Sequence, residues 1–113
     1  MTVQYKNQGI NLTTTDTASV LTCPTSATFL IKQVQVDNSS GGPVNLSVQV
    51  TDTSASATYS ISRKAIAANT VSNIITQTLI LEGGDILKMT AGTANEIQGI
   101  ISYAQLDRSQ ENG

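Results

Sequence analysis

Glu82 and Asp85 are the side chains whose spacing best suits a chemical role, because they flank Gly83-Gly84. In a tight turn, two carboxylates and nearby carbonyl oxygens can share a cation. Calcium, however, usually takes roughly six to eight oxygen ligands, and this turn supplies too few. Asp and Gly are also the residues that a turn selects for its own backbone. We therefore interpret residues 82–85 as a hairpin turn and expect neither a metal nor a cofactor.

Arg63 and Lys64 form a second cluster, close in sequence to Tyr59. An arginine can bind a carboxylate or a phosphate through two parallel hydrogen bonds. A charged pair beside a polar loop is also typical of ordinary solvated surface. Among the functional alternatives, the sequence favours a salt bridge at a protein interface over the binding of a small molecule.

Catalysis is the function against which the composition argues most strongly, because the chain has no histidine and a single cysteine. A nucleophilic thiol needs a base or a positive environment, and Cys23 instead follows the apolar residues Val20-Leu21. We expect it to pack as a small buried side chain. Serine and threonine are abundant, but no Ser-x-x-Lys arrangement accompanies them. We expect no catalytic residues and no enzymatic activity.

The charge of the chain is low and evenly spread. Charged residues make up 12% of the 113 residues, the net charge is −2, and the six Lys and Arg residues are scattered. Nucleic-acid binding usually needs a basic stripe, so we expect none. The sequence has no apolar run of about 18 residues and no apolar signal-peptide segment, which predicts a soluble chain without membrane contact, made in the cytoplasm.

The length fits one domain with one hydrophobic core. Aromatic residues are only 4% of the chain, so this core must be aliphatic. A thin aliphatic core gains stability from a partner surface, because folding leaves only a small balance between apolar burial and conformational entropy. We therefore expect a homo-oligomer.

A two-residue period identifies the fold class. Residues 44–51 alternate apolar and polar side chains without interruption, which predicts a strand with one apolar face. Residues 33–37 alternate in the same way, and the segment between them, 38–43, is rich in turn-forming residues. We interpret residues 28–51 as a β-hairpin.

Further short strands and turns follow along the chain. We expect a polar loop over 51–58, a short strand over 59–61, a connecting loop over 65–69, one or two strands over 71–81, a strand over 86–90, a turn over 91–95 and a last strand over 96–106. In that last strand Ile97, Gly99, Ile101 and Tyr103 share one face. Turns that recur between short strands predict an all-β fold, an antiparallel β-sandwich or jelly roll.

The two ends are expected to differ from the domain at 18–106. Residues 1–17 form an extended N-terminal arm, able to add a strand to this sheet or to that of a neighbour. Residues 107–113 are a polar C-terminal tail.

Several segments between residue 5 and about residue 106 occur together: 5–9 (Tyr-Lys-Asn-Gln-Gly), 21–24 (Leu-Thr-Cys-Pro), 31–38 (Ile-Lys-Gln-Val-Gln-Val-Asp-Asn), Thr70, 79–91 (Leu-Ile-Leu-Glu-Gly-Gly-Asp-Ile-Leu-Lys-Met-Thr-Ala) and 99–103 (Gly-Ile-Ile-Ser-Tyr). This combination resembles the small β-sandwich accessory virion proteins of tailed bacteriophages. Cys23 departs from that pattern, in which valine is usual at this position, but the change preserves packing.

The resemblance implies a structural role in a virion. The first expectation is a capsid decoration, or cement, protein that binds the outer capsid surface and stabilises the head, as a trimer or another symmetric oligomer. Its partners would be the major capsid protein or other virion proteins. A neck, tail or fibre component is the alternative. A carbohydrate-binding or adhesin-like module is a further one, although only three tyrosines are present to stack on sugars.

Contacts between subunits are expected from the arm, residues 1–17, and from the loop at 51–58. The expected interface residues are Val3, Tyr5, Ile10, Leu12, Tyr59, Arg63 and Lys64.

Overall fold

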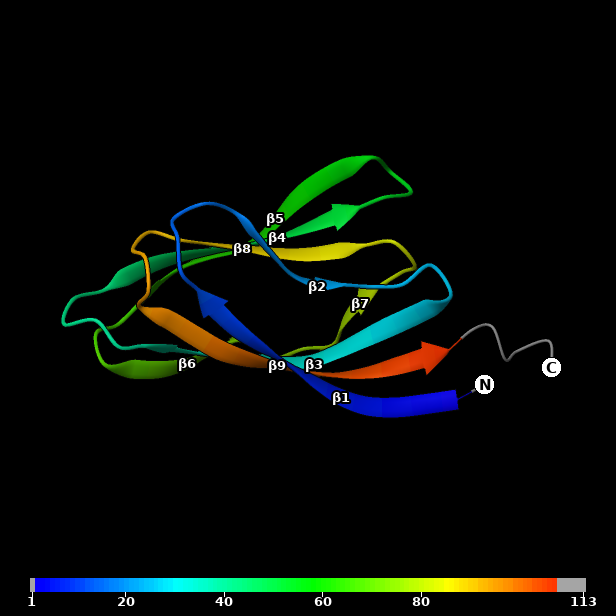
Figure 1. Ribbon diagram of the computed structural model, residues 1–113, viewed down its shortest axis with the longest axis horizontal. Helices are drawn as coiled ribbons and strands as arrows, with labels where there is room; N and C mark the ends of the chain where they lie inside the picture. The colour runs from blue at the N-terminus through cyan, green and yellow to red at the C-terminus, as the bar shows by residue number, and fades with distance from the viewer. Residues whose placement is uncertain (1, 108–113) are drawn as a thin grey trace.

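The structure, a computed structural model, describes residues 2–107, which form an elongated all-β domain (Figure 1). Its strands are β1 (Thr2–Leu12), β2 (Ala18–Thr22), β3 (Ala27–Asn38), β4 (Val44–Asp52), β5 (Ala57–Ile66), β6 (Thr70–Ile75), β7 (Leu79–Leu81), β8 (Ile86–Ala91) and β9 (Ile97–Asp107). Within this described part the structure has no helix, and hence none that is able to cross a membrane. The expected all-β class is confirmed.

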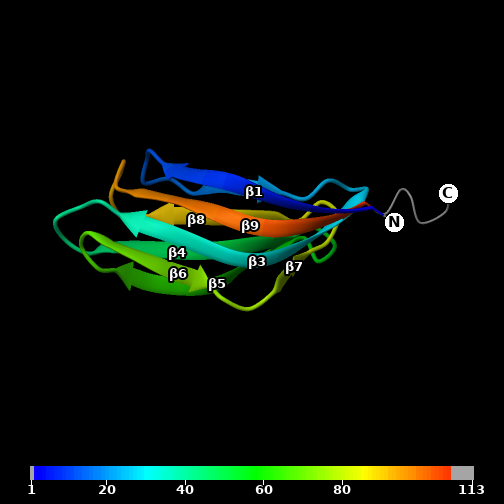
Figure 2. The ribbon, with the colours of Figure 1, turned by 90° about the horizontal axis from the view of Figure 1, so that it is seen from below.

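The strands pack as two antiparallel sheets with the order of a jelly roll. One sheet has the order β1-β9-β3-β6, with β7 also paired to β3, and the other has the order β2-β8-β4-β5. Because β6 and β7 pair with successive stretches of β3, they act as two halves of one interrupted strand. The remaining arrangement is the pair of Greek keys that defines a jelly roll. Figure 2 shows β1, β9, β3 and β6 succeeding one another across their sheet.

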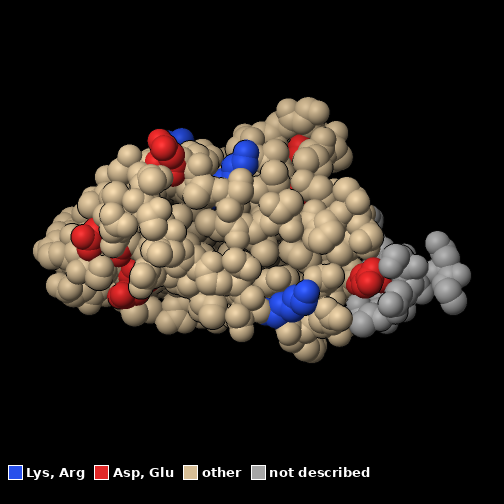
Figure 3. Space-filling view, viewed as in Figure 1, with Lys and Arg blue, Asp and Glu red and all other residues tan. Residues whose placement is uncertain are grey.

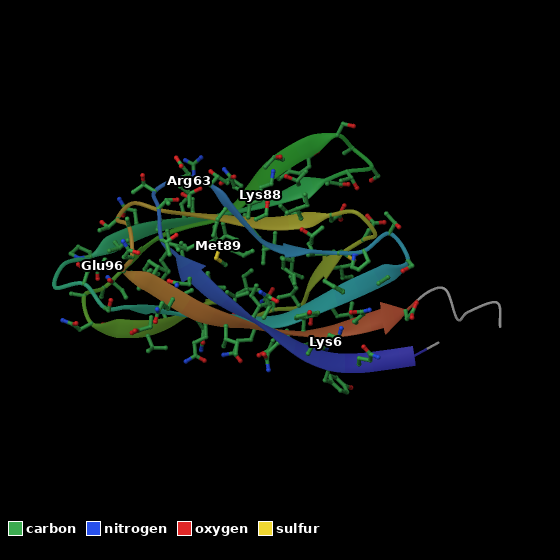
Figure 4. All side chains as sticks on the ribbon, viewed as in Figure 1. Lys6, Arg63, Lys88, Met89 and Glu96 are labelled. Atoms are coloured by element: carbon green, nitrogen blue, oxygen red, sulfur yellow. The ribbon has the colours of Figure 1, made fainter. Side chains whose placement is uncertain are left out.

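An aliphatic core fills the space between the sheets, as the composition predicted. The alternating apolar residues of β4 face it, and Met89 of β8 lies between the two layers in Figure 4. The largest fully buried side chains include Ile31, Leu46, Ile66, Leu81, Leu87, Met89, Ile97 and Ile101. Phe29 and Tyr103 add an aromatic contact, with ring centroids 4.6 Å apart. Ile97, Ile101 and Tyr103 share the inner face of β9, as expected.

The expected β-hairpin over 28–51 is wrong, because β3 and β4 lie in different sheets. Both strands turn an apolar face to the same core, so the two periodic patterns are those of facing strands rather than paired ones. Residues 39–43 cross from one sheet to the other. The buried Asn38 fixes this crossing: its Nδ2 donates to the carbonyls of Ile66 (2.9 Å) and Gly42 (3.0 Å), and its Oδ1 accepts from Ser40 N (2.9 Å).

Two expected boundaries also shift. The polar loop is shorter than 51–58, because β4 continues through Asp52 and β5 begins at Ala57. The strand expected over 59–61 therefore grows to the ten residues of β5. Residues 67–69 form a turn, in agreement with the connecting loop.

The chain ends are placed as follows. Residues 2–12 of the expected arm form β1, which pairs with β9 from Thr2 opposite Asp107 to Leu12 opposite Ile97. Of the expected tail, Asp107 ends β9, and 108–113 lie outside the described residues.

The central pair, β3 and β9, comes unusually close at Gly99. A Cβ at this position would lie 2.2 Å from the carbonyl oxygen of Gln35 and 3.0 Å from Cα of Val36. Glycine is the residue that permits such an approach of two backbones.

Candidate interaction surface

Residues 82–85 form a turn, as expected, but the prediction of a hairpin turn is wrong, because β7 and β8, which the turn joins, lie in different sheets. Asp85 is the structural centre of this turn. This carboxylate is buried. Its Oδ2 accepts from Glu82 N (2.9 Å), and its Oδ1 accepts from both N (3.2 Å) and Oγ1 (3.3 Å) of Thr53. Asp85 therefore joins its own turn to the turn between β4 and β5. Gly84 has a φ of 91°, a left-handed conformation that favours glycine.

Asp52 is the residue of this region that the sequence did not single out. Its carboxylate lies with those of Glu82 and Asp85, with ligand atoms within 4.8 Å of one another. The Asp52 Oδ1 atom, however, accepts from N (3.1 Å) and Oγ (2.8 Å) of Ser54. Backbone and hydroxyl donors thus already bind the carboxylates of Asp52 and Asp85. The role of these two residues is to stabilise the turns in which they lie.

Arg63, Lys64 and Tyr59 do not converge on one site. Arg63 of β5 pairs with Ser47 of β4 and is exposed on the outer face of the four-stranded sheet. Arg63 is labelled in Figure 4. Lys64 is on the opposite face of the strand, where its Nζ donates to Ser72 Oγ of β6 at 3.0 Å. Tyr59 is more than half exposed near the tip of the β4–β5 hairpin.

Cys23 is buried, as expected. Its thiol donates to the carbonyl oxygen of Ala27 at 3.3 Å.

The expected interface residues of β1 fall on two faces of the strand. Val3 and Tyr5 point outward, and Tyr5 is 84% exposed. The residue numbers of Ile10 and Leu12 differ from those of Val3 and Tyr5 by odd numbers, so Ile10 and Leu12 point inward and are buried in the core. Their side chains are not available to a partner, whereas those of Val3 and Tyr5 are.

Tyr5 begins an apolar row that crosses the outer face of the five-stranded sheet. Tyr5 is opposite Ala104 of β9, Ala104 is opposite Leu30 of β3, and Leu30 is opposite Ile80 of β7. Ile80 is 56% exposed, whereas Ala104, between two larger side chains, is 2% exposed. We call these four residues the apolar row. Directly opposite residues of paired strands are in side-chain contact range, so the row is continuous.

Polar and small residues surround the apolar row on one side and apolar ones extend it on the other. Toward the N-terminus of β1, Val3 pairs with Leu106, and Val3 is 50% exposed. In the other direction Asn7 pairs with Ser102, which pairs with Gln33. Figure 3 views the two sheets from the side, and the few charged side chains that it shows include Lys6 of β1, which is labelled in Figure 4. The outer face of the sheet thus presents an apolar row with a polar border, to which β3 adds the charged residues Lys32 and Asp37.

Two open grooves lie at the edges of the sandwich. One, of about 300 Å³, is lined by Ile61 of β5, Ile74 and the 76–78 segment between β6 and β7. The other, of about 380 Å³, lies between β1 and β2 and is lined by Lys6, Gln8 and Tyr103 among others. Burial raises the pKa of Tyr103 above its usual value, because the anionic phenolate is poorly solvated there.

The sequence indicated Val3 and Tyr5 but not Leu30 or Ile80. These two lie inside apolar runs, Phe29-Leu30-Ile31 and Leu79-Ile80-Leu81, in which the central residue faces out. An apolar residue at an outward position is the signal that would have found them once the register was known.

No model of a known protein family matches the chain. No curated protein matches its sequence. Among solved structures, a chain of the T13 viral particle of infectious bursal disease virus is similar at 7% identity and a TM-score of 0.57, over 91% of this chain and 30% of that one. This chain thus spans under a third of that viral chain.

Two other similar structures are smaller. A chain of Bacillus endospore appendages, which form disulfide-linked pili, has 12% identity and a TM-score of 0.53 over 92% of this chain and 86% of that one. A pentameric capsid protein from metagenomic phage sequences has 14% identity and a TM-score of 0.42, over 93% of this chain and 62% of that one. The fold is thus a viral capsid-like β fold, which this chain shares with a pilus-forming protein.

Proposed function

We propose that this protein is a structural component of a virion, and specifically a bacteriophage capsid decoration (cement) protein that binds the outer capsid surface. The observation that carries the proposal is the apolar row, which lies on the outer face of a capsid-like jelly roll. Exposed apolar patches with a polar border mark contact surfaces. A protein that acts through such a surface needs neither a cofactor nor a catalytic group.

The row suits a broad protein surface better than a small ligand. Tyr5 and Ile80 project from strands at opposite sides of the sheet, with β9 and β3 between them. Neighbouring strands are about 4.8 Å apart, so the row is roughly 14 Å long. Burying one such aliphatic side chain contributes about 1.5–3 kcal/mol, and a repeated partner surface such as a capsid offers the same contact many times.

The partner in this proposal is the major capsid protein or another virion protein, and the protein is located in the virion. Most homo-oligomers are symmetric, so that each copy repeats the same contact. The resemblance favours a trimer, whereas the strand edge described in the next section favours a two-fold pair, and the mass measurement given there separates these two predictions.

The experiment uses heads that lack the protein. Wild-type protein should bind them and raise the temperature at which they release their contents. Ile80→Ser, which removes the exposed end of the apolar row, should weaken binding at least about tenfold, since about 1.4 kcal/mol corresponds to that factor. Gln98→Ser, on the same sheet but outside the row, is the matched control. Equal binding by both variants would contradict the proposed surface.

A neck, tail or fibre position in the virion is the second candidate, since the same jelly roll and surface would serve there. Quantitative mass spectrometry of purified virions separates the two. A decoration protein repeats with the capsid lattice, on the order of hundreds of copies, whereas a neck or tail ring has about a dozen.

An adhesin-like module is the further alternative, and the highly exposed Tyr5 ring is the observation that favours it, because aromatic rings stack on sugars. Glycan-array binding by the isolated wild-type protein, lost in Tyr5→Ser, would support that alternative.

A further inference from the structure

The four sheet edges of the sandwich differ in how well they resist pairing with another strand. Within the described residues, β2 has five residues and a register irregularity, and the pairing of β5 with β4 shifts register near Val48. The edge formed by β6 and β7 is interrupted at 76–78. Short strands, bulges and interruptions are the usual devices that protect an edge.

The fourth edge, β1, lacks those devices. It pairs with β9 over eleven consecutive residues, Thr2–Leu12, without a register shift. It contains no proline, and Lys6 is its single charged residue. In Figure 2, β1 forms the margin of its sheet. About half of its backbone N–H and C=O groups point away from β9, as in any edge strand, and are therefore available to another strand.

We propose that β1 pairs antiparallel with β1 of a second copy of this chain, about a two-fold axis through Asn7. Full overlap of the two strands places Thr2 opposite Leu12 of the second copy, and Asn7 then lies opposite its own equivalent. The pairing joins the two five-stranded sheets into one continuous sheet. Such an isologous contact needs a self-complementary strand.

The sequence of β1 is self-complementary in this register. Tyr5 lies opposite Gly9 of the second copy, and both positions are on the outer face. A Cβ at Gly9 would meet no atom within 4 Å, so the space above it is open to the Tyr5 ring. Within its own sheet Gly9 pairs with Ile100, which is 41% exposed. The ring therefore covers both a bare backbone and an exposed isoleucine, a favourable cross-strand pair.

Charge does not oppose the pairing. Lys6 lies opposite Gln8 of the second copy, so no like charges face each other directly. Like charges placed directly opposite would destabilise a strand pair.

The first test uses cysteine cross-linking. In the proposed register the two copies of residue 7 have Cα atoms about 4.5–5.5 Å apart, within disulfide range. The two copies of residue 11 are separated by eight positions, about 27 Å. After mild oxidation, Asn7→Cys should give a covalent dimer and Asn11→Cys should not. Wild type serves as the background, because Cys23 is buried. Equal cross-linking of both variants, or none in Asn7→Cys, would overturn the pairing.

The second test measures mass in solution by light scattering, up to about 1 mM protein. Wild type should reach twice the monomer mass of 11.8 kDa. Asn7→Lys places two added lysines next to each other at the axis. The dissociation constant of the dimer should therefore rise about fivefold or more. A trimer, or a monomer throughout, refutes the two-fold pair. Circular dichroism and thermal melting confirm that each variant folds.

This inference shares Tyr5 with the apolar row of the proposed function, but substitutions at residues that belong to only one of the two contacts distinguish them. Ile80 is three strands away from β1, so Ile80→Ser should impair head binding and keep the dimer. Asn7→Lys should impair the dimer of the isolated protein whether or not the heads bind it. Loss of the dimer in Ile80→Ser would contradict the β1 contact.

Discussion

Gly99→Ala is the substitution whose cost follows most directly from the geometry. The added methyl group would lie 2.2 Å from the carbonyl oxygen of Gln35, more than 1 Å closer than ordinary van der Waals contact, and 3.0 Å from both Cα and Cγ1 of Val36. Two of these three atoms are backbone, so no side-chain rotation relieves the overlap. Instead β9 and β3, the central pair of the five-stranded sheet, must move apart.

Overpacking of a well-packed core costs typically about 1–3 kcal/mol, and we expect the upper end, about 3 kcal/mol, because two strands must shift. For a domain of this size that loss lowers the melting temperature by at least about 10 °C. Urea unfolding followed by circular dichroism gives the free energy, at a low protein concentration so that association does not contribute.

Gly9→Ala is the matched control, because it makes the same change in the same sheet with no atom within 4 Å of the new Cβ. Its unfolding free energy should stay within about 0.5 kcal/mol of wild type. If Gly99→Ala also stayed within that range, the close approach of the two backbones would be refuted.

Three further predictions concern buried polar groups. Asp85→Asn turns an amide donor toward donors of Thr53 or of the 82–85 turn, so urea unfolding should show a loss of about 1–3 kcal/mol. Asn38→Asp sets a carboxylate against backbone carbonyls, so its stability should be low at neutral pH and recover as the pH falls toward about 4. Burial raises the pKa of Tyr103 in the folded protein above its usual value of 10.0. The free energy of unfolding should therefore fall as the pH rises above that value, because the unfolded chain releases the phenol proton more readily. Tyr103→Phe should therefore lose less stability than wild type between pH about 8 and about 11, and an equal loss would contradict the buried phenol.

The sequence predicted the class of fold because strand periodicity is a local property. The alternating residues of 44–51 and the Gly-Gly turn at 82–85 are where the patterns put them. The pairing of strands is not local, and it is there that the prediction of a hairpin over 28–51 was wrong. Facing strands and paired strands both bury one face, so their patterns are the same, and only the crossing fixed by Asn38 separates the two arrangements.

The candidate surface was predictable in part, for a related reason. Val3 and Tyr5 have odd positions, whereas Ile10 and Leu12 have even ones, and a regular strand sends these pairs to opposite faces. Parity alone therefore separates the exposed pair from the buried pair. Leu30 could not be assigned in this way, because the register irregularity between Ile31 and Gln33 interrupts the alternation of β3.

The central position of β9 has a consequence for synthesis of the protein. Both neighbours of β9 in the sheet, β1 and β3, are made long before residues 97–107 leave the ribosome. Until then each lacks the strand that later pairs with it, and contacts between residues so distant in sequence form slowly. Until β9 is made, this half of the sandwich therefore exposes unpaired strand edges, and such edges favour aggregation.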